Sequence, residues 1–400
     1  MRHDLHDILR DATRLTRAGR LQEATTALQQ ALGLPPMPGG AAPGAGAARS
    51  PAAPAASAAP AGWVIDGCVT ERPDDTAPAA GAAGRAEPAP TSPAAAPSTA
   101  PVAPPGAAAR PAADRFVAGS FTHGGRTLAY KLFVPASAAS APAGTRPPLV
   151  LMLHGCTQHP DDFAAGTGMN DRAREQGAIV LYPAQAQDAN PQRCWNWFKH
   201  SHQQRGRGEP ALLAALAQAV ARQEGADPER IYVAGLSAGG AMAAILARTY
   251  PDVFAAAGVH SGLAPGTARD AMAALNAMRS GQGPGAPAAG TAAAAPTIVF
   301  HGDADTTVHP GHGDHVLAAA APGLAAGPVE RGTTARGRRW SRSVVPRGDG
   351  RGVQAESWQL HGGGHAWSGG LAAGSYTDPA GPDASAEMLR FFLAHGRRQA

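Results

Sequence analysis

The chain has 400 residues, of which 44% are hydrophobic, 5% aromatic and 16% charged, and its formal net charge is +4. A positive charge this small, without a basic stripe interleaved with aromatic residues, argues against a nucleic-acid partner. No apolar run reaches the about 18 residues that a membrane span needs. The three cysteines lack metal-ligand spacing, so we expect neither a membrane span nor a cysteine-based metal site.

The first 34 residues predict a helical hairpin, because apolar residues recur at helical spacing on both sides of Gly19. Such a pair of helices buries little surface by itself. We therefore expect it to dock on the main domain, on a partner or on an apolar surface, or to be held weakly. It contains no apolar signal-peptide segment, which favours a cytoplasmic location.

Residues 35–113 consist mainly of Ala, Pro and Gly and predict a disordered linker, because few large apolar side chains are available for burial. The exception is the island at residues 62–68, which includes Trp63, Val64 and Ile65. We interpret this island as a candidate docking segment.

Residues 114–400 predict one α/β domain. A hairpin is predicted from residues 116–121 and 127–134, and a second from residues 339–345 and 353–360. Apolar strands are expected at residues 148–153, 178–182, 231–234, 254–259 and 297–300, helices at residues 209–223, 241–250 and 384–394, and a mobile loop at residues 281–296. Strands alternating with helices indicate a mostly parallel sheet with helices on both faces.

The pattern Gly-x-Ser-x-Gly at residues 235–239 lies between a predicted strand and a predicted helix. Strand, sharp turn and helix form the context in which this pattern is a nucleophile elbow, with Ser237 as the nucleophile. Gly235 and Gly239 let the strand and the helix approach closely. The backbone N–H of Ala238 is then a candidate oxyanion donor.

A serine nucleophile needs a histidine base, and the base needs a carboxylate that orients it. Asp303 and Asp305 both follow the strand at residues 297–300, and His361 and His365 both follow the strand at residues 353–360. We favour Asp305, because the pattern His-Gly-x-x-Asp-x-x-Val places the acid there in many α/β-hydrolases, and we assign Asp303 a loop-shaping role. We favour His365, because three glycines precede it in a loop able to reach Ser237.

The loop after the strand at residues 148–153 should supply the second oxyanion donor, which we assign to the backbone N–H of Cys156. Cys156 and Cys194 are both expected in loops at the carboxyl edge of the sheet. A disulfide between them and two free thiols are both compatible with the sequence.

Five motifs in this order resemble the poly(3-hydroxybutyrate) depolymerase-type esterases, which are close to the feruloyl and acetylxylan esterases. They are HGCTQ at residues 154–158, NPQRCWNWF at 190–198, GLSAGG at 235–240, HGDAD at 301–305 and GHAW at 364–367. The resemblance covers about residues 115–395. It implies an α/β-hydrolase fold, a Ser-His-Asp triad without metal or cofactor, hydrolysis of short-chain polyhydroxyalkanoate esters and, since many members are secreted, an extracellular location.

The resemblance leaves the substrate open between a polyester and the feruloyl or acetyl esters of plant polysaccharide. A third hypothesis is a granule-binding protein that attaches through the N-terminal hairpin and carries an inert hydrolase domain. An apolar polyester calls for a groove of large rigid side chains. We therefore assign substrate contacts to Trp195 and Trp197, and we also name Gln158 as a substrate-binding candidate.

Overall fold

The computed structural model describes residues 63–66, 113–139, 142, 144–285 and 294–397. All of them belong to one compact unit, Ala61–Ala400. The helical hairpin predicted at residues 1–34 and most of the linker predicted at residues 35–113 lie outside the described residues. The loop predicted at residues 281–296 is described only in part.

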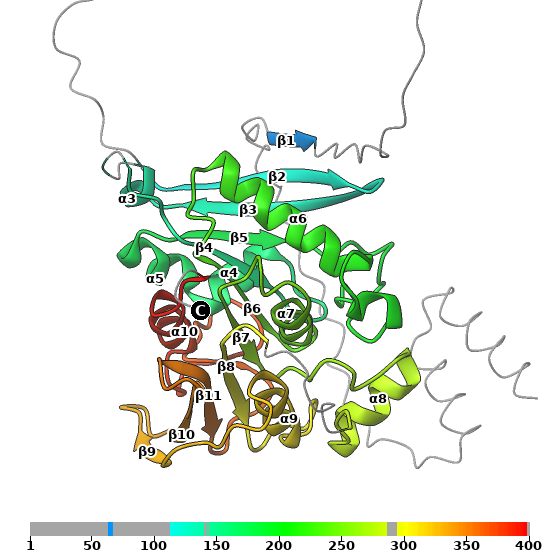
Figure 1. Ribbon diagram of the computed structural model, residues 1–400, viewed down its shortest axis with the longest axis vertical. Coiled ribbons are helices and arrows are strands. Elements are labelled where there is room, and N and C mark those ends of the chain that lie inside the picture. The colour runs from blue at the N-terminus through cyan, green and yellow to red at the C-terminus, as the bar shows by residue number, and fades with distance from the viewer. Residues whose placement is uncertain (1–62, 67–112, 140–141, 143, 286–293, 398–400) are drawn as a thin grey trace, which may run out of the picture. The chain divides into compact units, whose positions relative to one another are not determined.

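One sheet runs through the domain (Figure 1), and eleven of its strands fall within the described residues, in the order β1-β2-β3-β5-β4-β6-β7-β8-β11-β10-β9. Their bounds are β1 Trp63–Asp66, β2 Arg115–His123, β3 Arg126–Val134, β4 Leu149–Leu153, β5 Ile179–Pro183, β6 Ile231–Leu236, β7 Ala256–His260, β8 Thr297–Gly302, β9 Glu330–Thr333, β10 Arg339–Pro346 and β11 Val353–Leu360. A separate pair consists of β12 Trp367–Ser368 and β13 Thr377–Asp378.

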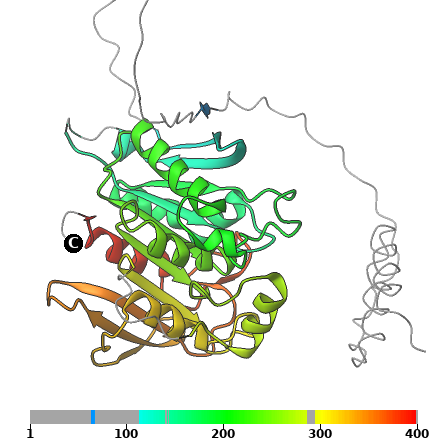
Figure 2. The ribbon, with the colours of Figure 1, turned by 45° about the vertical axis from the view of Figure 1, so that its right-hand side comes forward.

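The helices lie on both faces of the sheet (Figures 1 and 2). Helices α6, α7, α8 and α9 pack on one face, and α4, α5 and α10 pack on the other. Their bounds are α3 Ala136–Ala139, α4 Pro160–Thr167, α5 Met169–Gln176, α6 Gly208–Gln223, α7 Ala238–Thr249, α8 Ala271–Ser280, α9 Gly311–Ala320 and α10 Ala384–Leu393, with a short 3₁₀ helix at His200–Gln203.

The central strands are buried along their whole length because helices cover both faces of the sheet, and β4 is apolar throughout. In β4, Leu149, Leu151 and Leu153 point into one hydrophobic core, whereas Val150 and Met152 point into the other. A strand with solvent on one side would alternate between apolar and polar residues instead. The continuous runs in the sequence therefore correspond to the parallel centre of the sheet.

The strand connections give the α/β-hydrolase fold. Strands β5, β4, β6, β7, β8 and β11 run parallel, and antiparallel strands flank them on both sides. Parallel strands direct their carboxyl ends to one edge of the sheet, where ligands bind in open α/β sheets. The loops after β4, β6, β8 and β11 therefore meet at this edge.

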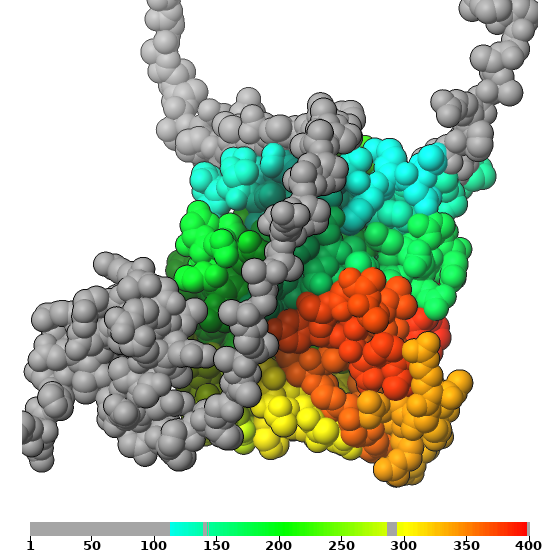
Figure 3. Space-filling view, turned by 180° about the vertical axis from the view of Figure 1, so that it is seen from behind, coloured from blue at the N-terminus to red at the C-terminus, as the bar shows by residue number. Residues whose placement is uncertain are grey.

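Most sequence-predicted strands and helices of this domain are present within two residues of the expected bounds. Of the island at residues 62–68, the structure describes Trp63–Asp66, which form β1 and pair in parallel with residues Gly119 to Thr122 of β2. Helices α3, α4, α5, α8 and α9, the 3₁₀ helix and strands β9, β12 and β13 were not predicted. Figure 3 shows the other side of the molecule, where the orange β9–β10 region forms one corner.

Candidate active site

Ser237 lies in the sharp turn between β6 and α7, in a strained backbone conformation with φ 57° and ψ −119°. The turn is this tight because two glycines permit it. A Cβ on Gly239 would lie 2.0 Å from the carbonyl oxygen of Leu153, and one on Gly235 would lie 2.4 Å from the backbone of Gly239. The turn places Ser237 at the N-terminus of α7, where the helix dipole favours negative charge.

The backbone N–H of Ser237 donates a hydrogen bond to the carbonyl oxygen of His260 at 2.9 Å. The ring of His260 accepts a hydrogen bond from the backbone N–H of Ser368, and it stacks on Trp367 with 5.2 Å between the ring centroids. Complete burial lowers the pKa of His260 to about 3, so this ring is neutral. His260 thus connects the turn of Ser237 with the segment that follows His365.

The structure brings Asp305 and His365 together, with 2.7 Å between Oδ2 of Asp305 and Nδ1 of His365. Because the carboxylate accepts the hydrogen bond, the neutral imidazole carries its proton on Nδ1 and leaves Nε2 as the basic atom. Ser237 and His365 line the same cavity. The hydroxyl of Ser237 makes no hydrogen bond to His365 in this structure, and such contacts often form only when substrate is bound.

Asp305 is a buried anion with several donors. Burial by itself would raise its pKa, but hydrogen bonds from His301, His365 and the backbone of Val308 hold the pKa of Asp305 far below its ordinary value. The backbone N–H groups of Thr307 and Val308 each donate to Oδ1 at 2.9 Å. Asp305 is therefore ionised at all ordinary pH values and stays directed at His365.

The two competing residues form a pair of their own. Nδ1 of His361 donates to Oδ2 of Asp303 at 2.8 Å, and the backbone N–H of Gly362 donates to Oδ1 at 2.6 Å. Neither Asp303 nor His361 lines the cavity that contains Ser237. The loop-shaping role predicted for Asp303 agrees with these contacts.

The loop after β4 leaves one backbone donor available. Oε1 of Gln158 accepts the N–H of Gly155 at 2.9 Å, and its Nε2 donates to Asp162 and Ser375. The backbone N–H groups of Cys156 and Ala238 donate no hydrogen bond to any described residue. Gln158 lines the cavity beside Ser237, and its amide is bonded within the loop, so its predicted contact with a substrate stays a prediction.

A disulfide joins Cys156 to Cys194. The backbone N–H of Thr157 also donates to the carbonyl oxygen of Gln192 at 2.7 Å. The sequence left the disulfide and two free thiols as alternatives, and the structure contains the disulfide. The bond attaches the loop with the candidate oxyanion donor to the loop that carries Trp197.

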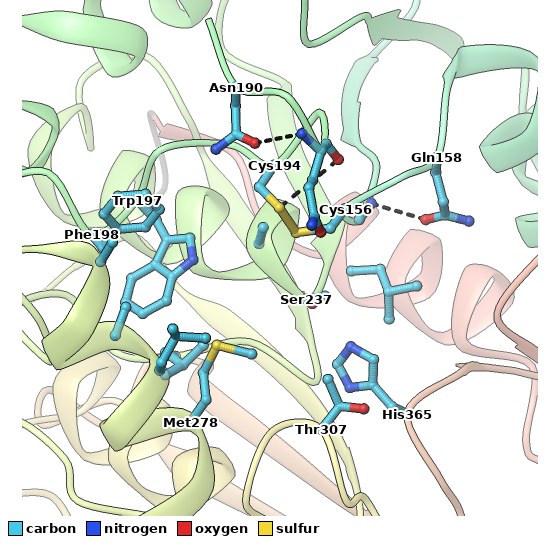
Figure 4. Close-up of a pocket in the computed structure, with 18 of the residues that line it drawn as sticks. Cys156, Gln158, Asn190, Cys194, Trp197, Phe198, Ser237, Met278, Thr307 and His365 are labelled. Carbon is cyan, nitrogen blue, oxygen red and sulfur yellow. Dashed lines mark hydrogen bonds between the residues drawn. A yellow bond between two sulfur atoms is a disulfide. The ribbon is translucent and has the colours of Figure 1, made fainter. Parts of the chain in front are cut away.

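A cavity of about 500 Å³ opens beside Ser237. Figure 4 shows Ser237, His365 and Thr307 close together on one side, with Trp197, Phe198 and Met278 across from them. The wall is mostly apolar. It includes Cys156, Gln158, Asn190, Cys194, Leu236, Ala238, Leu263, Ala271, Ala274, Leu275 and Tyr376 in addition to the residues just named.

The structure separates the two tryptophans that the sequence placed on one face of a groove. Trp197 is 4% exposed and lines the cavity, whereas Trp195 is 0% exposed, does not line it and packs on the ring of His154. The assignment of Trp195 to substrate contact is thus corrected. Its side chain fills the core because residues 195–197 do not run as an extended strand, and the N–H of Trp197 bonds to the carbonyl of Trp195 at 2.9 Å.

The buried carboxylate of Glu209 anchors the loop that carries Trp195 and Trp197 through hydrogen bonds. Oε1 of Glu209 accepts hydrogen bonds from the side chains of Gln185 and Asn196, and Oε2 accepts the backbone N–H of Asn196 at 2.7 Å. Burial by itself would raise the pKa of Glu209, but the nearby His202 and the donors Asn196 and Gln185 lower it. The loop therefore rests on an ionised, hydrogen-bonded side chain.

Backbone strain concentrates around the cavity. Five non-glycine residues among those described have positive φ, namely Thr157, Arg193, Ser237, Ser261 and Tyr376. Ser237 and Tyr376 line the cavity, Thr157 and Arg193 are adjacent to the disulfide, and Ser261 follows His260. Strained residues of this kind cluster at functional sites.

Two contributions to the cavity were not predicted. Helix α8 supplies Ala271, Ala274, Leu275 and Met278, and Tyr376 comes from the segment before β13. An amphipathic spacing over residues 271–280 was the available signal for α8. No local sequence signal marks Tyr376, because it reaches the cavity only through the tertiary fold.

In the part of the chain that the structure covers, no group of three or more His, Cys, Asp or Glu side chains could hold a metal ion. The described helices include none with the length and apolar character needed to cross a bilayer.

Comparison with known proteins identifies the family. The chain is 40% identical over 110 residues to poly(3-hydroxyalkanoate) depolymerase C of Paucimonas lemoignei, covering 28% of this chain and 26% of that protein. It is 36% identical over 152 residues to poly(3-hydroxybutyrate) depolymerase of Ralstonia pickettii, covering 36% and 31%. It is 34% identical over 131 residues to feruloyl esterase B of Thermothelomyces thermophilus, covering 32% and 44%.

The matches span less than half the length of each of these relatives. The family match is broader, because residues 128–327, half of the chain, match the family described as Esterase PHB depolymerase. The α/β-hydrolase fold and the loops that meet around Ser237 agree with that match, and the chain belongs to this esterase family.

Proposed function

We propose that this protein is a serine esterase that hydrolyses the ester bonds of short-chain polyhydroxyalkanoates through an acyl-enzyme. The observation that carries the proposal is the geometry around one cavity: Ser237 in a strained turn, and His365 beside it with Nδ1 bonded to the buried carboxylate of Asp305. Nucleophile, base and orienting acid are the three groups that acyl transfer requires.

In the proposed reaction, Nε2 of His365 accepts the hydroxyl proton of Ser237 as Oγ attacks the ester carbonyl carbon. The backbone N–H groups of Cys156 and Ala238 donate hydrogen bonds to the resulting oxyanion, and neither N–H bonds to another described residue. The imidazolium then protonates the oxygen of the departing alcohol, and the acyl group remains bound to Oγ of Ser237 as the acyl-enzyme. Nε2 of His365 next deprotonates a water molecule, which attacks the acyl-enzyme ester. The carboxylic acid is released as the imidazolium returns the proton to Oγ of Ser237.

The cavity wall supports a polyester substrate. Helix α8 and Leu263 contribute aliphatic side chains, and the amide of Gln158 is occupied by protein partners. An aliphatic hydroxyalkanoate chain has methyl branches and few hydrogen-bond donors, so it gains most from such a wall.

A feruloyl ester is the second candidate. Trp197 and Phe198 lie in the wall with their rings 5.8 Å apart, and an aromatic acyl group would pack against such a pair. The relative named feruloyl esterase B adds to this alternative.

A paired assay tests the proposal. Purified protein is given trimers of 3-hydroxybutyrate and methyl ferulate at matched concentrations, with phosphonate-inactivated protein as the blank. We expect a higher kcat/KM for the trimer. A higher value for methyl ferulate would transfer the assignment to the second candidate. No turnover of either ester or of a model acetyl ester would favour a binding protein with an inert hydrolase domain.

A further inference from the structure

The loops that carry the proposed acid and base leave the sheet side by side. Gly302 ends β8 and Leu360 ends β11, and these two residues are paired in the parallel ladder. Asp305 lies three residues beyond Gly302, and His365 lies five residues beyond Leu360. The direction of His365 toward Ser237 therefore depends on how the two loops are held against each other.

Four hydrogen bonds connect the first residues of these loops. Two join backbone groups, from Asp303 N to the oxygen of Leu360 at 3.1 Å and from Ala304 N to the oxygen of Gly363 at 3.0 Å. The other two end on the side chain of Asp303, whose Oδ2 accepts from His361 and whose Oδ1 accepts from Gly362. Half of these contacts therefore depend on one carboxylate.

A third strand anchors the histidine of this pair. The hydroxyl of Ser341, within β10, donates to Nε2 of His361 at 2.8 Å. The resulting order of Ser341, His361 and Asp303 repeats the residue types of a catalytic triad. Ser341 nevertheless lies inside a strand paired on both sides, with Arg331 and with Gln359, and it has neither the strained turn nor the helix N-terminus that presents Ser237.

The loop needs such an anchor because residues 362–364 are all glycine. Glycine has more backbone freedom than any other residue, so three in succession do not define a path by themselves. On the far side of His365, the loop is held where Ser368 and Trp367 meet His260. On the near side, two side chains hold it: Asp303, which accepts from His361 and Gly362, and Arg338, whose Nη1 donates to the carbonyl oxygen of His361 at 3.1 Å.

We propose that the Asp303–His361 pair is a positioning device, which fixes the glycine loop so that His365 is directed at Ser237 while bonded to Asp305. This inference rests on the proposed hydrolytic role of those three residues. Asp303 and His361 touch no part of the Ser237 cavity, so the pair acts through the loop and not on the substrate.

The test is steady-state hydrolysis of a small soluble ester by Asp303→Ala, Asp303→Asn and the parent protein. Asp303→Ala should lower kcat by about tenfold to a hundredfold with little change in KM, because a displaced base weakens the chemical step and not binding. Its side chain is 34% exposed, so the variant should remain folded, which the melting temperature verifies.

Asp303→Asn should restore most of the rate. The amide oxygen can accept the N–H of Gly362, and the amide nitrogen can donate to Nδ1 of His361. The ring then carries its proton on Nε2 and donates to Ser341. Asp349→Ala is the matched control. Like Asp303, Asp349 accepts a backbone N–H, in this case that of Arg351, but it lies in the turn at the opposite end of β11. It should match the parent.

His361→Ala should cause a similar loss, and the double variant Asp303→Ala/His361→Ala should lose no more than either single variant, because the two side chains act as one unit. A fully additive double loss, an Asp303→Ala kcat within about twofold of the parent, or an Asn variant as slow as the Ala variant would overturn the inference.

Phosphonate labelling mapped by mass spectrometry separates the two proposals. Labelling of Ser237 in the parent and slower labelling in Asp303→Ala support the positioning role. Labelling of Ser341 would overturn it, because Ser341 would then be a nucleophile in its own right. A parent protein with neither turnover nor labelling would refute the proposed function itself.

Discussion

Cys156, whose backbone N–H is a proposed oxyanion donor, is joined by a disulfide to Cys194, which lies three residues before the cavity residue Trp197. The bond spans 38 residues of sequence and connects two loops that emerge from different strands. One covalent link thus holds both the oxyanion donor and a wall of the cavity.

Reduction of this disulfide should lower both activity and stability. A disulfide of this span contributes about 2–4 kcal/mol to the free energy of unfolding, and the freed Cys156 loop would lose its fixed direction. We expect a single reactive thiol, that of Cys68, when denatured but unreduced protein is titrated. Three reactive thiols in protein from an oxidising compartment would contradict the bond, and Cys68→Ser serves as the control for the titration.

Ser237→Ala should abolish ester hydrolysis and leave the fold unchanged. In a comparable triad enzyme, removal of the nucleophile lowers turnover by about 10⁶. The measurement is kcat on a soluble ester, with circular dichroism and melting temperature as controls. Measurable turnover in a folded Ser237→Ala preparation, free of parent protein, would remove Ser237 from the mechanism.

Asp305→Asn should lower kcat by about 10⁴, because the amide would present an N–H to His365 and stabilise the wrong tautomer. The variant can still accept the N–H groups of Thr307 and Val308 through its oxygen, so the loop should persist. Asp303→Asn should lose far less, and the reverse ranking of these two variants would show that the acid is Asp303.

Trp195 and Trp197 should respond differently to substitution. Trp195→Ala should lower the free energy of unfolding by about 3–5 kcal/mol, because it empties a fully buried site. Trp195→Phe should be much milder, since the indole N–H of Trp195 has no hydrogen-bond partner.

Trp197→Ala should raise KM for hydroxybutyrate oligomers. Equal oligomer KM values for Trp197→Ala and the parent would remove Trp197 from the substrate site.

Glu209→Gln should destabilise the protein by about 1–3 kcal/mol near neutral pH, because one of the amide N–H groups would face donors. The pKa of Glu209 is lowered in the folded state from its ordinary 4.5. The stability from its ionised form is therefore present above 4.5 and is lost as the pH falls through the lower folded value. Melting curves of parent and variant should converge on acidification, and a gap independent of pH would contradict this account.

The sequence predicted the sheet well because its central strands are covered on both faces. A run such as residues 149–153 has no polar position, and only a doubly covered strand buries all of it. The residues at the ends of these strands could be assigned for the same reason, since parallel strands bring Ser237, Asp305 and His365 to one edge. The pattern also favoured Asp305 over Asp303; the structure pairs Asp305 with His365, and the catalytic role of Asp305 stays a prediction.

The cavity wall could not be predicted in this way. Whether Trp195 or Trp197 faces the substrate depends on a turn between them and on the Glu209 network, neither of which has a periodic signature. Gln158 lines the cavity, but the hydrogen bonds of its amide with Gly155 and Asp162 had no signal in the sequence. Tyr376 reaches the cavity from a segment more than 130 residues after Ser237.

The close backbone contacts at the elbow have a consequence for any survey of variants. A side chain at Gly239 would collide with two carbonyl oxygens of the neighbouring strand end, which cannot move aside as a flexible side chain would. In a pooled library scored separately for cellular abundance and for ester turnover, Gly235 and Gly239 variants should disappear from both scores. Ser237 variants should remain abundant while scoring zero for turnover. Within one turn, variants of the two glycines would therefore lose the folded protein, whereas variants of the serine two residues away would lose only the catalytic step.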